Sequence, residues 1–291
     1  MKYQNKEGWL FVAPLLCWLA FSICVPLYIA IELSFFDIKI IGTEGKFVGF
    51  KNYLKTLNSS KFPKALTNSI YWVLANAVTQ TFFAFLIALT LNKHFKGVKI
   101  ATNWIILSFI IPTVVIVVIW KLMLSSSSGI INSLLVQLHI IDKPIGFFSS
   151  STSAFVSLVL INSWRWSPFL ALIILSGLKS IHQEIYDASK IDGAGFFAEF
   201  FQITLPQLKG VLFVLGLVGT LLSFNVFDII WLITKGGPSS ATTTLPLLIY
   251  ETAFTKFRLS QAAALSVITS FILLTFSIVF IKVMGKDHDE R

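Results

Sequence analysis

Hydrophobic residues along this chain gather in six long segments, which polar or turn-forming residues separate. Each segment is mostly uncharged and reaches about 20 residues, the length that an α-helix needs to cross the hydrocarbon core of a bilayer. The segments are residues 9–35, 68–91, 102–124, 153–177, 208–233 and 261–283. This pattern predicts an all-α, polytopic membrane protein with six transmembrane helices in a single domain, residues 1–291. An even number of crossings places both ends of the chain on the same side of the membrane.

The longest polar passage between two apolar segments, residues 184–206, has a pattern of its own. Its apolar side chains recur at three- and four-residue steps up to Phe197, which is the spacing of one helix face. Gly193 and Gly195 interrupt this pattern, and glycine permits turns that other residues resist. The passage predicts a short helix, a sharp turn and a second short helix that leads to Pro206. Exposed apolar side chains on such a helix-turn-helix indicate a surface that docks onto a partner.

The composition excludes several other classes of protein. Hydrophobic residues make up 55% of the chain and charged residues 13%, whereas soluble domains carry about 25% charged residues. The net charge is +9, but the lysines are spread over the loops without forming a basic stripe. We therefore expect anionic lipid headgroups and no nucleic acid as partners. Cys17 and Cys24 lie roughly 10 Å apart along one helix, too far for a disulfide, and are expected to be buried.

The positions of lysine and arginine decide the predicted orientation. Their totals on the two sides of the membrane are nearly equal, but those on the side of the termini lie in shorter loops close to helix ends. Basic residues in short loops are typical of the cytoplasmic side. We expect both termini to be cytoplasmic, and the segment 184–206 with them.

Two loops on the other side have different predicted characters. In the loop 36–67, aromatic and leucine side chains alternate with Lys51 and Lys55 at helical spacing, which predicts an amphipathic helix at the membrane surface. This helix either contacts an external partner or caps the bundle. The loop 125–151 is rich in serine and glycine and is expected to be a flexible connection.

Polar side chains also occur inside the predicted spans, around Arg165 and within residues 219–228. Pro112 and Pro168 are expected to kink their helices. Polar groups inside a bilayer are costly and by default face a cavity or a partner, although small residues also serve close helix packing. Both roles stay open here, and Arg165 either pairs with Asp228, contacts a substrate or extends along its own helix. The candidates for a substrate pathway are Asn162, Trp166, Gly219, Ser223, Asn225 and Asp228.

The sequence lacks the motifs of an enzyme. It contains no glycine-rich phosphate loop followed by lysine and serine or threonine, and no recognisable nucleophile motif. Its four histidines lie in different loops without metal-ligand spacing. We expect no catalytic residue, metal or cofactor in this chain, so that any uphill transport draws its energy from a partner or from an ion gradient.

Within residues 184–206, the triplet Asp187-Ala188-Ser189 is followed after three residues by Gly193 and after nine more by Ile203-Thr204-Leu205-Pro206. This spacing resembles the EAA loop of binding-protein-dependent ABC importer permeases, E-A-A, three residues, G, nine residues, I-x-L-P. Asp187 and Ser189 are conservative departures from it. The resemblance extends from about residue 9 to 283 and includes the passages LFVAPLL, VGFKNYL and TKGGP. These are similar to the first of the two permeases in carbohydrate-uptake systems of the maltose and glycerol-phosphate type.

The resemblance implies a permease subunit of a bacterial plasma-membrane importer that works by alternating access. Implied partners are a second homologous permease, two copies of a cytoplasmic ABC ATPase that bind ATP-Mg, an extracytoplasmic solute-binding protein and a sugar. Its implied ATPase-coupling residues are Glu184, Asp187, Ala188, Ser189, Asp192, Gly193 and Ala194. In maltose-type relatives the first permease contacts sugar midway across the membrane, and Asn162, Trp166, Gly219 and Ser223 match those positions. Trp166 and Gly219 depart from the residue types expected there, which leaves the sugar open.

Three other interpretations compete with this one. An ion-coupled secondary transporter would need inverted repeats and discontinuous helices at mid-membrane, which the sequence does not reveal. A membrane scaffold would have no effect on uptake, and an ABC exporter subunit usually carries its ATPase on the same chain or uses other coupling loops. Among substrates, a mono- or oligosaccharide leads, with a glycerol phosphate ester or another polyol derivative as the alternative.

Overall fold

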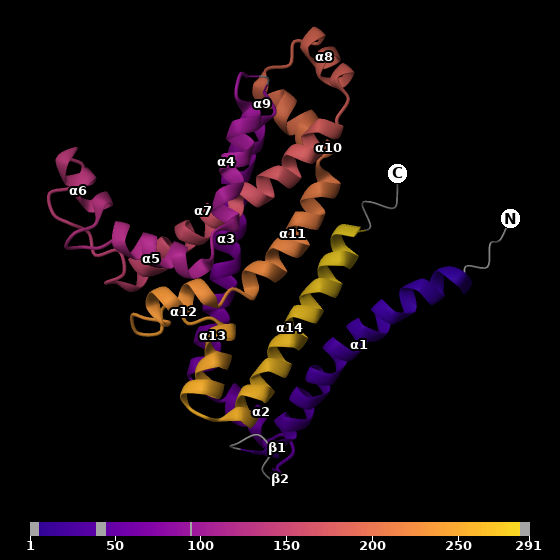
Figure 1. Cartoon of the computed structure of the whole chain (residues 1–291), viewed down its shortest axis with the longest axis vertical. Coiled ribbons are helices and arrows are strands. Elements are labelled where there is room, and N and C mark those ends of the chain that lie inside the picture. Colours follow the sequence, from indigo (N-terminus) through magenta and orange to yellow (C-terminus); the bar gives the residue numbers. More distant parts are fainter. Residues whose placement is uncertain (1–5, 39–44, 94, 286–291) are drawn as a thin grey trace. The chain divides into compact units, whose positions relative to one another are not determined.

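A computed structural model describes residues 6–38, 45–93 and 95–285 of the chain (Figure 1). Apart from the short strands β1 (Phe36–Asp37) and β2 (Lys46–Phe47), which pair antiparallel, the regular elements of these residues are helices. Contacts divide the chain into two units, Met1–Pro63 with Leu248–Leu274 and Lys64–Leu247 with Thr275–Arg291. A single domain over residues 1–291 therefore stays a prediction. Residues 1–5 and 286–291, which belong to the predicted cytoplasmic termini, lie outside the described residues.

The first unit holds α1, the β-hairpin, α2 and the helical segments that lead into the last helix. Its elements are α1 (Lys6–Phe35), α2 (Lys51–Leu57), the π-helix η2 (Glu251–Thr255) and most of α14 (Leu259–Gly285). The Asn52 amide joins α2 to the end of α1, since Nδ2 donates to the carbonyl oxygens of Ser34 and Phe36, both at 2.9 Å. The Ile38 amide donates to Ser260 Oγ at 2.8 Å, which joins the hairpin to the start of α14. The amphipathic helix predicted in this loop is α2.

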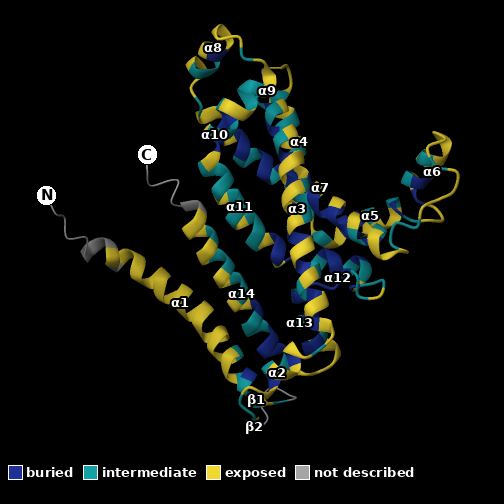
Figure 2. Cartoon of the chain, turned by 180° about the vertical axis from the view of Figure 1, so that it is seen from behind, coloured by how far each residue is buried: buried dark blue, intermediate teal, exposed yellow. Residues whose placement is uncertain are grey.

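Helix α1 exposes its side chains along most of its length, as the yellow ribbon in Figure 2 shows. Cys17 and Cys24 are free thiols and are exposed, so their predicted burial is wrong for this chain. An apolar helix without a buried face is suited to lipid or to another membrane helix as its surroundings.

The second unit is organised around two long helices, α3 and α7. Helix α3 spans Lys61–Leu91, of which the first three residues belong to the first unit, and α7 spans Ser151–Ser180. The other elements of the second unit are α4 (Val98–Ile110), α5 (Thr113–Met123), α6 (Ile130–Gln137), α8 (Gln183–Ile191), α9 (Phe196–Ala198), the π-helix η1 (Glu199–Thr204), α10 (Leu205–Gln207), α11 (Lys209–Phe224), α12 (Asp228–Thr234), the start of α13 (Leu245–Tyr250) and the end of α14. Ala84 and Ala88 of α3 and Ala171 of α7 are completely buried in its core. Such small side chains let membrane helices approach closely.

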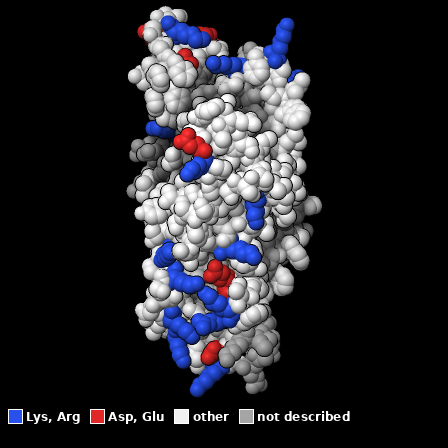
Figure 3. All heavy atoms as spheres, turned by 90° about the vertical axis from the view of Figure 1, so that its left-hand side faces the viewer, with Lys and Arg blue, Asp and Glu red and all other residues white. Residues whose placement is uncertain are grey.

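Four helical segments are long and apolar enough to cross a membrane by themselves: Phe11–Phe35, Lys61–Leu91, Ser151–Ser180 and Leu259–Val283. Two further candidates are helix pairs with a sharp bend, Val98–Ile110 with Thr113–Met123 and Phe196–Gln207 with Lys209–Phe224. By length and composition, the described residues thus hold four candidate spans, or up to six if each bent pair is one span. Most surface atoms on the face in Figure 3 belong to uncharged residues, as a membrane location requires.

The third predicted span, 102–124, is interrupted at Ile111 and Pro112, and the two halves are bent by 96°. Ile111 is extended, with φ −62° and ψ 130°, because a residue before proline is disfavoured in the helical conformation. The predicted kink at Pro112 is confirmed and amounts to a break. Pro168 differs, since α7 continues past it to Ser180.

The fifth predicted span, 208–233, is not one continuous helix. Helix α11 ends at Phe224, and α12 begins only at Asp228. The Asn225 side chain donates from Nδ2 to the Leu221 carbonyl at 2.8 Å, and such local bonds compete with helix propagation. Asp228 Oδ1 then accepts the Ile229 amide at 2.9 Å at the start of α12. A continuous helix over 208–233 is therefore a wrong prediction.

The loop 125–151 is also more ordered than its composition indicates. It contains α6, and the side chain of Asn132 on that helix is 3% exposed. Asn132 Nδ2 donates to the carbonyls of Ser125 and Ile145, and its Oδ1 accepts the Ile145 amide at 2.8 Å. One buried amide thus closes the loop, which a count of serines and glycines does not detect.

Candidate functional site

Residues 183–207 form the helix, turn and helix that the sequence predicts. Helix α8 ends in a turn where Gly193 has φ +77°, a conformation that favours glycine. The Gly193 amide donates to the Lys190 carbonyl at 3.1 Å and the Ala194 amide to the Ser189 carbonyl at 2.9 Å. Beyond the turn, α9, η1 and α10 form the second helical stretch. Figure 1 shows α8 past the ends of α7 and α11, between which the segment runs in sequence. We call residues 184–206 the coupling segment.

The predicted coupling residues are mostly on the surface of this segment. Exposed residues are Glu184, Asp187, Ala188, Asp192 and Gly193, while Ala194 is half-buried. Ser189 points inward and is 6% exposed, and its Oγ donates to the Tyr186 carbonyl at 2.8 Å. Ser189 thus holds α8 together, whereas the others are open to a partner.

Large apolar side chains stand exposed on the same segment. Ile191 is 87% exposed, and Phe196, Phe197 and Phe201 are exposed as well. Asp187, on the same helix as Ile191, makes side-chain contacts within α8, with Lys190 Nζ at 3.4 Å and Gln183 Nε2 at 3.3 Å. Ion pairs between such exposed side chains contribute about 0–1 kcal/mol, so a partner's basic group can replace Lys190 at little cost.

The inner side of the coupling segment packs against α3 of the second unit, and polar and aromatic contacts hold it there. The hydroxyl oxygens of Tyr186 on α8 and Thr204 in η1 are 3.2 Å apart, and Thr204 is buried. The ring of Phe200 meets Phe85 of α3 edge-on at 5.6 Å. A cavity of about 170 Å³ between these elements is lined by Tyr186, Phe200 and Thr204 among others. Side-chain contacts therefore connect α8 to η1 and η1 to α3.

A buried chain of amides joins α3 to α7. Asn162 is completely buried, and its Nδ2 donates to Asn76 Oδ1 at 2.7 Å. The same oxygen accepts from Gln80 Nε2 at 2.9 Å, and Asn76 Nδ2 donates to the Trp72 carbonyl at 2.8 Å. Asn162 Oδ1 is buried without a hydrogen-bond partner among the described residues. In this conformation Asn162 lies at a helix contact.

A cavity of about 240 Å³ brings two of the predicted pathway residues together. Gly219 and Ser223 of α11 line it with Gln80 of α3 and Leu170 of α7. Asn162 reaches this cavity only indirectly, since Gln80 and Asn162 bond the same Asn76 oxygen. Trp166, Asn225 and Asp228 are not part of this lining. The six predicted pathway residues are therefore not all brought to one place in this conformation.

Arg165 and Asp228 form an ion pair, which is one of the three alternatives that the sequence left open for Arg165. Arg165 Nη1 is 3.3 Å from Asp228 Oδ2, and Thr113 Oγ1 donates to that same oxygen at 2.6 Å. Arg165 also lies over the ring of Trp166, with its guanidinium carbon 5.7 Å from the centroid. Trp166 in turn meets Phe109 at 5.4 Å. This cluster connects α4, α5, α7 and α12 around the break at Pro112.

Asn76, Gln80 and Thr113 belong to these clusters but were not among the predicted residues. A usable signal existed, because Asn76 and Gln80 lie four residues apart in an apolar segment and so share a helix face. No signal pointed to Thr113, whose partner Asp228 is distant in sequence. Within the part of the chain that the structure describes, no three His, Cys, Asp or Glu residues form a group that could hold a metal ion.

Comparison with known proteins identifies the class of protein. The family described as binding-protein-dependent transport system inner membrane component matches residues 80–284. The trehalose/maltose transport system permease protein MalF of Thermococcus litoralis is 34% identical over 97% of this chain and 95% of its own length. The lactose transport system permease protein LacF of Rhizobium radiobacter is 29% identical, with 97% and 94% covered. The chain belongs to this family of membrane permease subunits of ABC importers.

Solved structures agree on the fold. A bacterial ABC transporter involved in the import of the acidic polysaccharide alginate contains a chain with a TM-score of 0.82 to this one, at 21% identity and 97% coverage of both chains. The alginate transporter in complex with a periplasmic protein bound to an alginate pentasaccharide gives 0.76, at 21% identity, with 95% and 94% covered.

Membership in this family settles several of the expectations. The chain is a transport component and not an ATPase, because separate subunits of such importers hydrolyse ATP. Dependence on a binding protein is a property of the family. The helix breaks at Pro112 and after Phe224 are a feature that secondary transporters also show, but the family match excludes that alternative.

Proposed function

We propose that this chain forms, with a second homologous permease, the membrane pathway for a sugar that a solute-binding protein delivers. Two cytoplasmic ABC ATPase subunits bind ATP-Mg and drive the cycle through the coupling segment. The names of the relatives support a sugar, since they describe permeases for trehalose, maltose and lactose. A glycerol phosphate ester or another polyol derivative stays the alternative substrate. The complex sits in the cell membrane with both termini of this chain in the cytoplasm.

The exposed apolar surface of the coupling segment is the observation that carries this proposal. Ile191, Phe196 and Phe197 are exposed on a segment that lies in sequence between α7 and α11, and the same segment exposes the acidic side chain of Asp187. Burying such side chains contributes about 1.5–3 kcal/mol each for a large aliphatic or aromatic group, which is enough to anchor a partner. A groove with a basic rim on the ATPase would match the charge of Asp187.

The side-chain contacts of α8 provide the route by which its movement reaches the membrane helices. When the ATPase subunits close, α8 moves, and the contacts of Tyr186 with Thr204 and of Phe200 with Phe85 carry the displacement into η1 and α3. Helix α11 follows directly after this stretch and bears Gly219 and Ser223. Movement of α11 would change the cavity that these two residues line. Such rigid-body shifts between two states are how alternating access works.

The test is sugar-stimulated ATP hydrolysis by the complete complex in liposomes. The ligand of the solute-binding protein is identified first by thermal shift across a panel of sugars and polyol phosphates. Asp187→Lys places a positive charge against a basic rim, so we expect docking of the ATPase to weaken about tenfold and stimulation to fall with it. The chain should still insert in the membrane, because Asp187 is exposed.

Asp142→Lys is the matched control, since Asp142 is an exposed aspartate in the loop after α6 and the change in charge is the same. It should leave ATPase docking unaltered. Normal copurification of an active ATPase with the Asp187→Lys chain would contradict the role of Asp187. If no ATPase associates even with the unmodified chain, the proposed function itself fails.

A further inference from the structure

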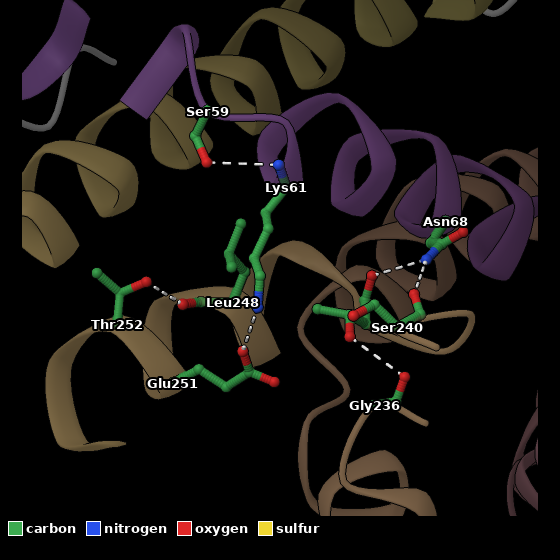
Figure 4. A network of polar contacts seen from close by, with 9 residues as sticks. Ser59, Lys61, Asn68, Gly236, Ser240, Leu248, Glu251 and Thr252 are labelled. Atoms are coloured by element: carbon green, nitrogen blue, oxygen red, sulfur yellow. Dashed lines mark hydrogen bonds and ion pairs between the residues drawn. The ribbon is translucent and has the colours of Figure 1, made fainter. Parts of the chain in front are cut away.

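Three basic side chains meet in the first unit beside a single acidic one. Lys61 begins α3, and Lys256 and Arg258 flank Phe257 between η2 and α14. Lys61 Nζ is 4.0 Å from Glu251 Oε2, as drawn in Figure 4. No other acidic side chain in the described part of the first unit is within ion-pair distance of these cations. The cluster therefore carries an excess of positive charge.

The same side chains line a small cavity. It measures about 60 Å³ and is lined by Lys61, Lys256 and Arg258 together with Thr56, Ser59 and Gln261. One water molecule needs about 10–15 Å³ of such space, so this cavity has room for a group the size of a small oxyanion. Its lining is largely polar, unlike that of the apolar cavities expected between membrane helices.

Two polar atoms of this lining have no partner. Thr56 is 3% exposed, and its Oγ1 is buried without a hydrogen bond among the described residues, as is Oε1 of Gln261. An unpaired buried polar group costs about 1–3 kcal/mol, and natural structures rarely leave one without a ligand, an ion or water. The Thr56 hydroxyl can donate to an oxyanion. A half-turn of the Gln261 amide presents its NH₂ group in place of the oxygen.

Glu251 compensates the three positive charges only in part. Burial lowers the pKa of the Lys256 ammonium, and repulsion from Lys61 and Arg258 lowers it further, against the attraction of Glu251. A bound anion would favour the charged form of Lys256, because its negative charge attracts all three basic groups at once. The N-terminus of α14, whose first turn contributes Gln261 to the lining, adds the positive end of a long helix to the field.

The location of the cavity identifies the level in the membrane at which an anion would bind. Lys61 and Leu259 are the first residues of two candidate spans, Lys61–Leu91 and Leu259–Val283. The ends of spans lie where hydrocarbon gives way to phospholipid headgroups. We propose that Lys61, Lys256 and Arg258, with the hydroxyl of Thr56, form a binding site for a phosphate group. Its source is either the headgroup of an anionic phospholipid or free phosphate.

The experiment measures thermal unfolding of the purified full chain in detergent, titrated separately with inorganic phosphate, phosphatidylglycerol and phosphatidylcholine. We expect a saturable rise in the midpoint with phosphatidylglycerol or with phosphate, and none with the zwitterionic phosphatidylcholine. A response to inorganic phosphate assigns the site to the free anion, and a response to phosphatidylglycerol alone assigns it to the lipid. No saturable response to either one, or an equal response to phosphatidylcholine, overturns the proposal.

Two variants and one control locate the site. In the double variant Lys256→Gln and Arg258→Gln, affinity should fall at least about tenfold, because charge-assisted hydrogen bonds are lost. The double variant Lys51→Gln and Lys55→Gln removes the same charge from exposed positions on α2 and should keep the affinity. Equal losses in both double variants would mean diffuse attraction and would overturn the site.

Thr56→Val distinguishes a ligand contact from a structural role. The substitution keeps the shape of the side chain and removes an unpartnered hydroxyl, so the midpoint without ligand should not fall. Affinity should drop severalfold if Thr56 Oγ1 donates to the phosphate group. Unchanged affinity in Thr56→Val would remove this cavity as the binding site.

Discussion

At the scale of single residues, three glycines in helices of the second unit differ in their surroundings. A Cβ added to Gly177 would lie 2.7 Å from Leu208, and one added to Gly216 would lie 2.9 Å from Phe280. A Cβ added to Gly219 would have no neighbour within 4 Å. Gly177 and Gly216 thus serve close packing, whereas Gly219 opens into the cavity of about 240 Å³. The packing role that the sequence left open for Gly219 has no support in these contacts.

Gly219→Leu should therefore block the proposed pathway without disrupting the fold. Its side chain would occupy the cavity, and we expect sugar uptake into vesicles to fall about tenfold or more, while the free energy of unfolding changes by only about 0.5 kcal/mol. Gly216→Leu is the counterpart, because its side chain would collide with Phe280 and reduce complex assembly. Full uptake by the Gly219→Leu chain in an intact complex would mean that this cavity is not on the pathway.

The pair of Arg165 and Asp228 shows what single-residue reasoning can reach. The sequence identifies both residues as costly inside a membrane and names their pairing as one alternative, which the distance of 3.3 Å now supports. It does not identify Thr113 as the second partner of Asp228, because that contact depends on the break at Pro112. Hydrogen bonds between distant positions depend on the path of the backbone, and hydrophobic patterns do not contain that information.

At the scale of elements, the length of apolar runs predicts helices well but predicts their interruptions poorly. The break at Pro112 could be anticipated in kind, since proline lacks an amide hydrogen, but the bend of 96° could not. The end of α11 has a weaker signal, a side chain at Asn225 that bonds back to its own helix. The helix-turn-helix of the coupling segment was predictable because glycine and helical spacing occur together there.

The turn of the coupling segment offers a matched pair of substitutions. Gly193 has φ +77°, whereas Gly195 has φ −78° and ψ 169°, and neither has a neighbour close to an added Cβ. Alanine at position 193 must adopt a left-handed conformation that costs roughly 1–2 kcal/mol, while alanine at 195 fits its extended backbone. We expect Gly193→Ala to reduce sugar-stimulated ATP hydrolysis severalfold and Gly195→Ala to leave it close to normal. Comparable activities for the two variants would show that the shape of this turn does not limit coupling.

At the scale of the whole molecule, the proposed orientation can be tested by chemical labelling. In a background of Cys17→Ser and Cys24→Ser, a single cysteine is introduced as Asp142→Cys or Asp187→Cys, both at exposed positions. In intact cells, a membrane-impermeant maleimide should label the chain with Asp142→Cys and spare the chain with Asp187→Cys until the cells are permeabilised. The reverse pattern would place the coupling segment outside the cytoplasm.

Membrane location and the family follow from the sequence because they depend on composition and on motif spacing. What covers each exposed apolar surface does not follow from the sequence of one chain, because lipid and a partner subunit favour the same apolar side chains. Helix α1 is the main example, with exposed side chains such as Trp18 and Tyr28 along an apolar helix. Side chains of this kind fit lipid and a neighbouring subunit equally well, so the assembled complex decides which of the two surrounds α1.

The π-helix η1 has a further consequence for how this segment varies. It spans Glu199–Thr204, inside the nine residues that separate Gly193 from Ile203 and just beyond them. A π-helical turn accommodates one more residue than an α-helical turn. The additional residue rotates the helix that precedes η1 relative to the helix that follows it. The length of this stretch therefore sets the angular phase between α8 and α11. A permease that gained or lost one residue here would keep every docking side chain and yet present them in the wrong direction.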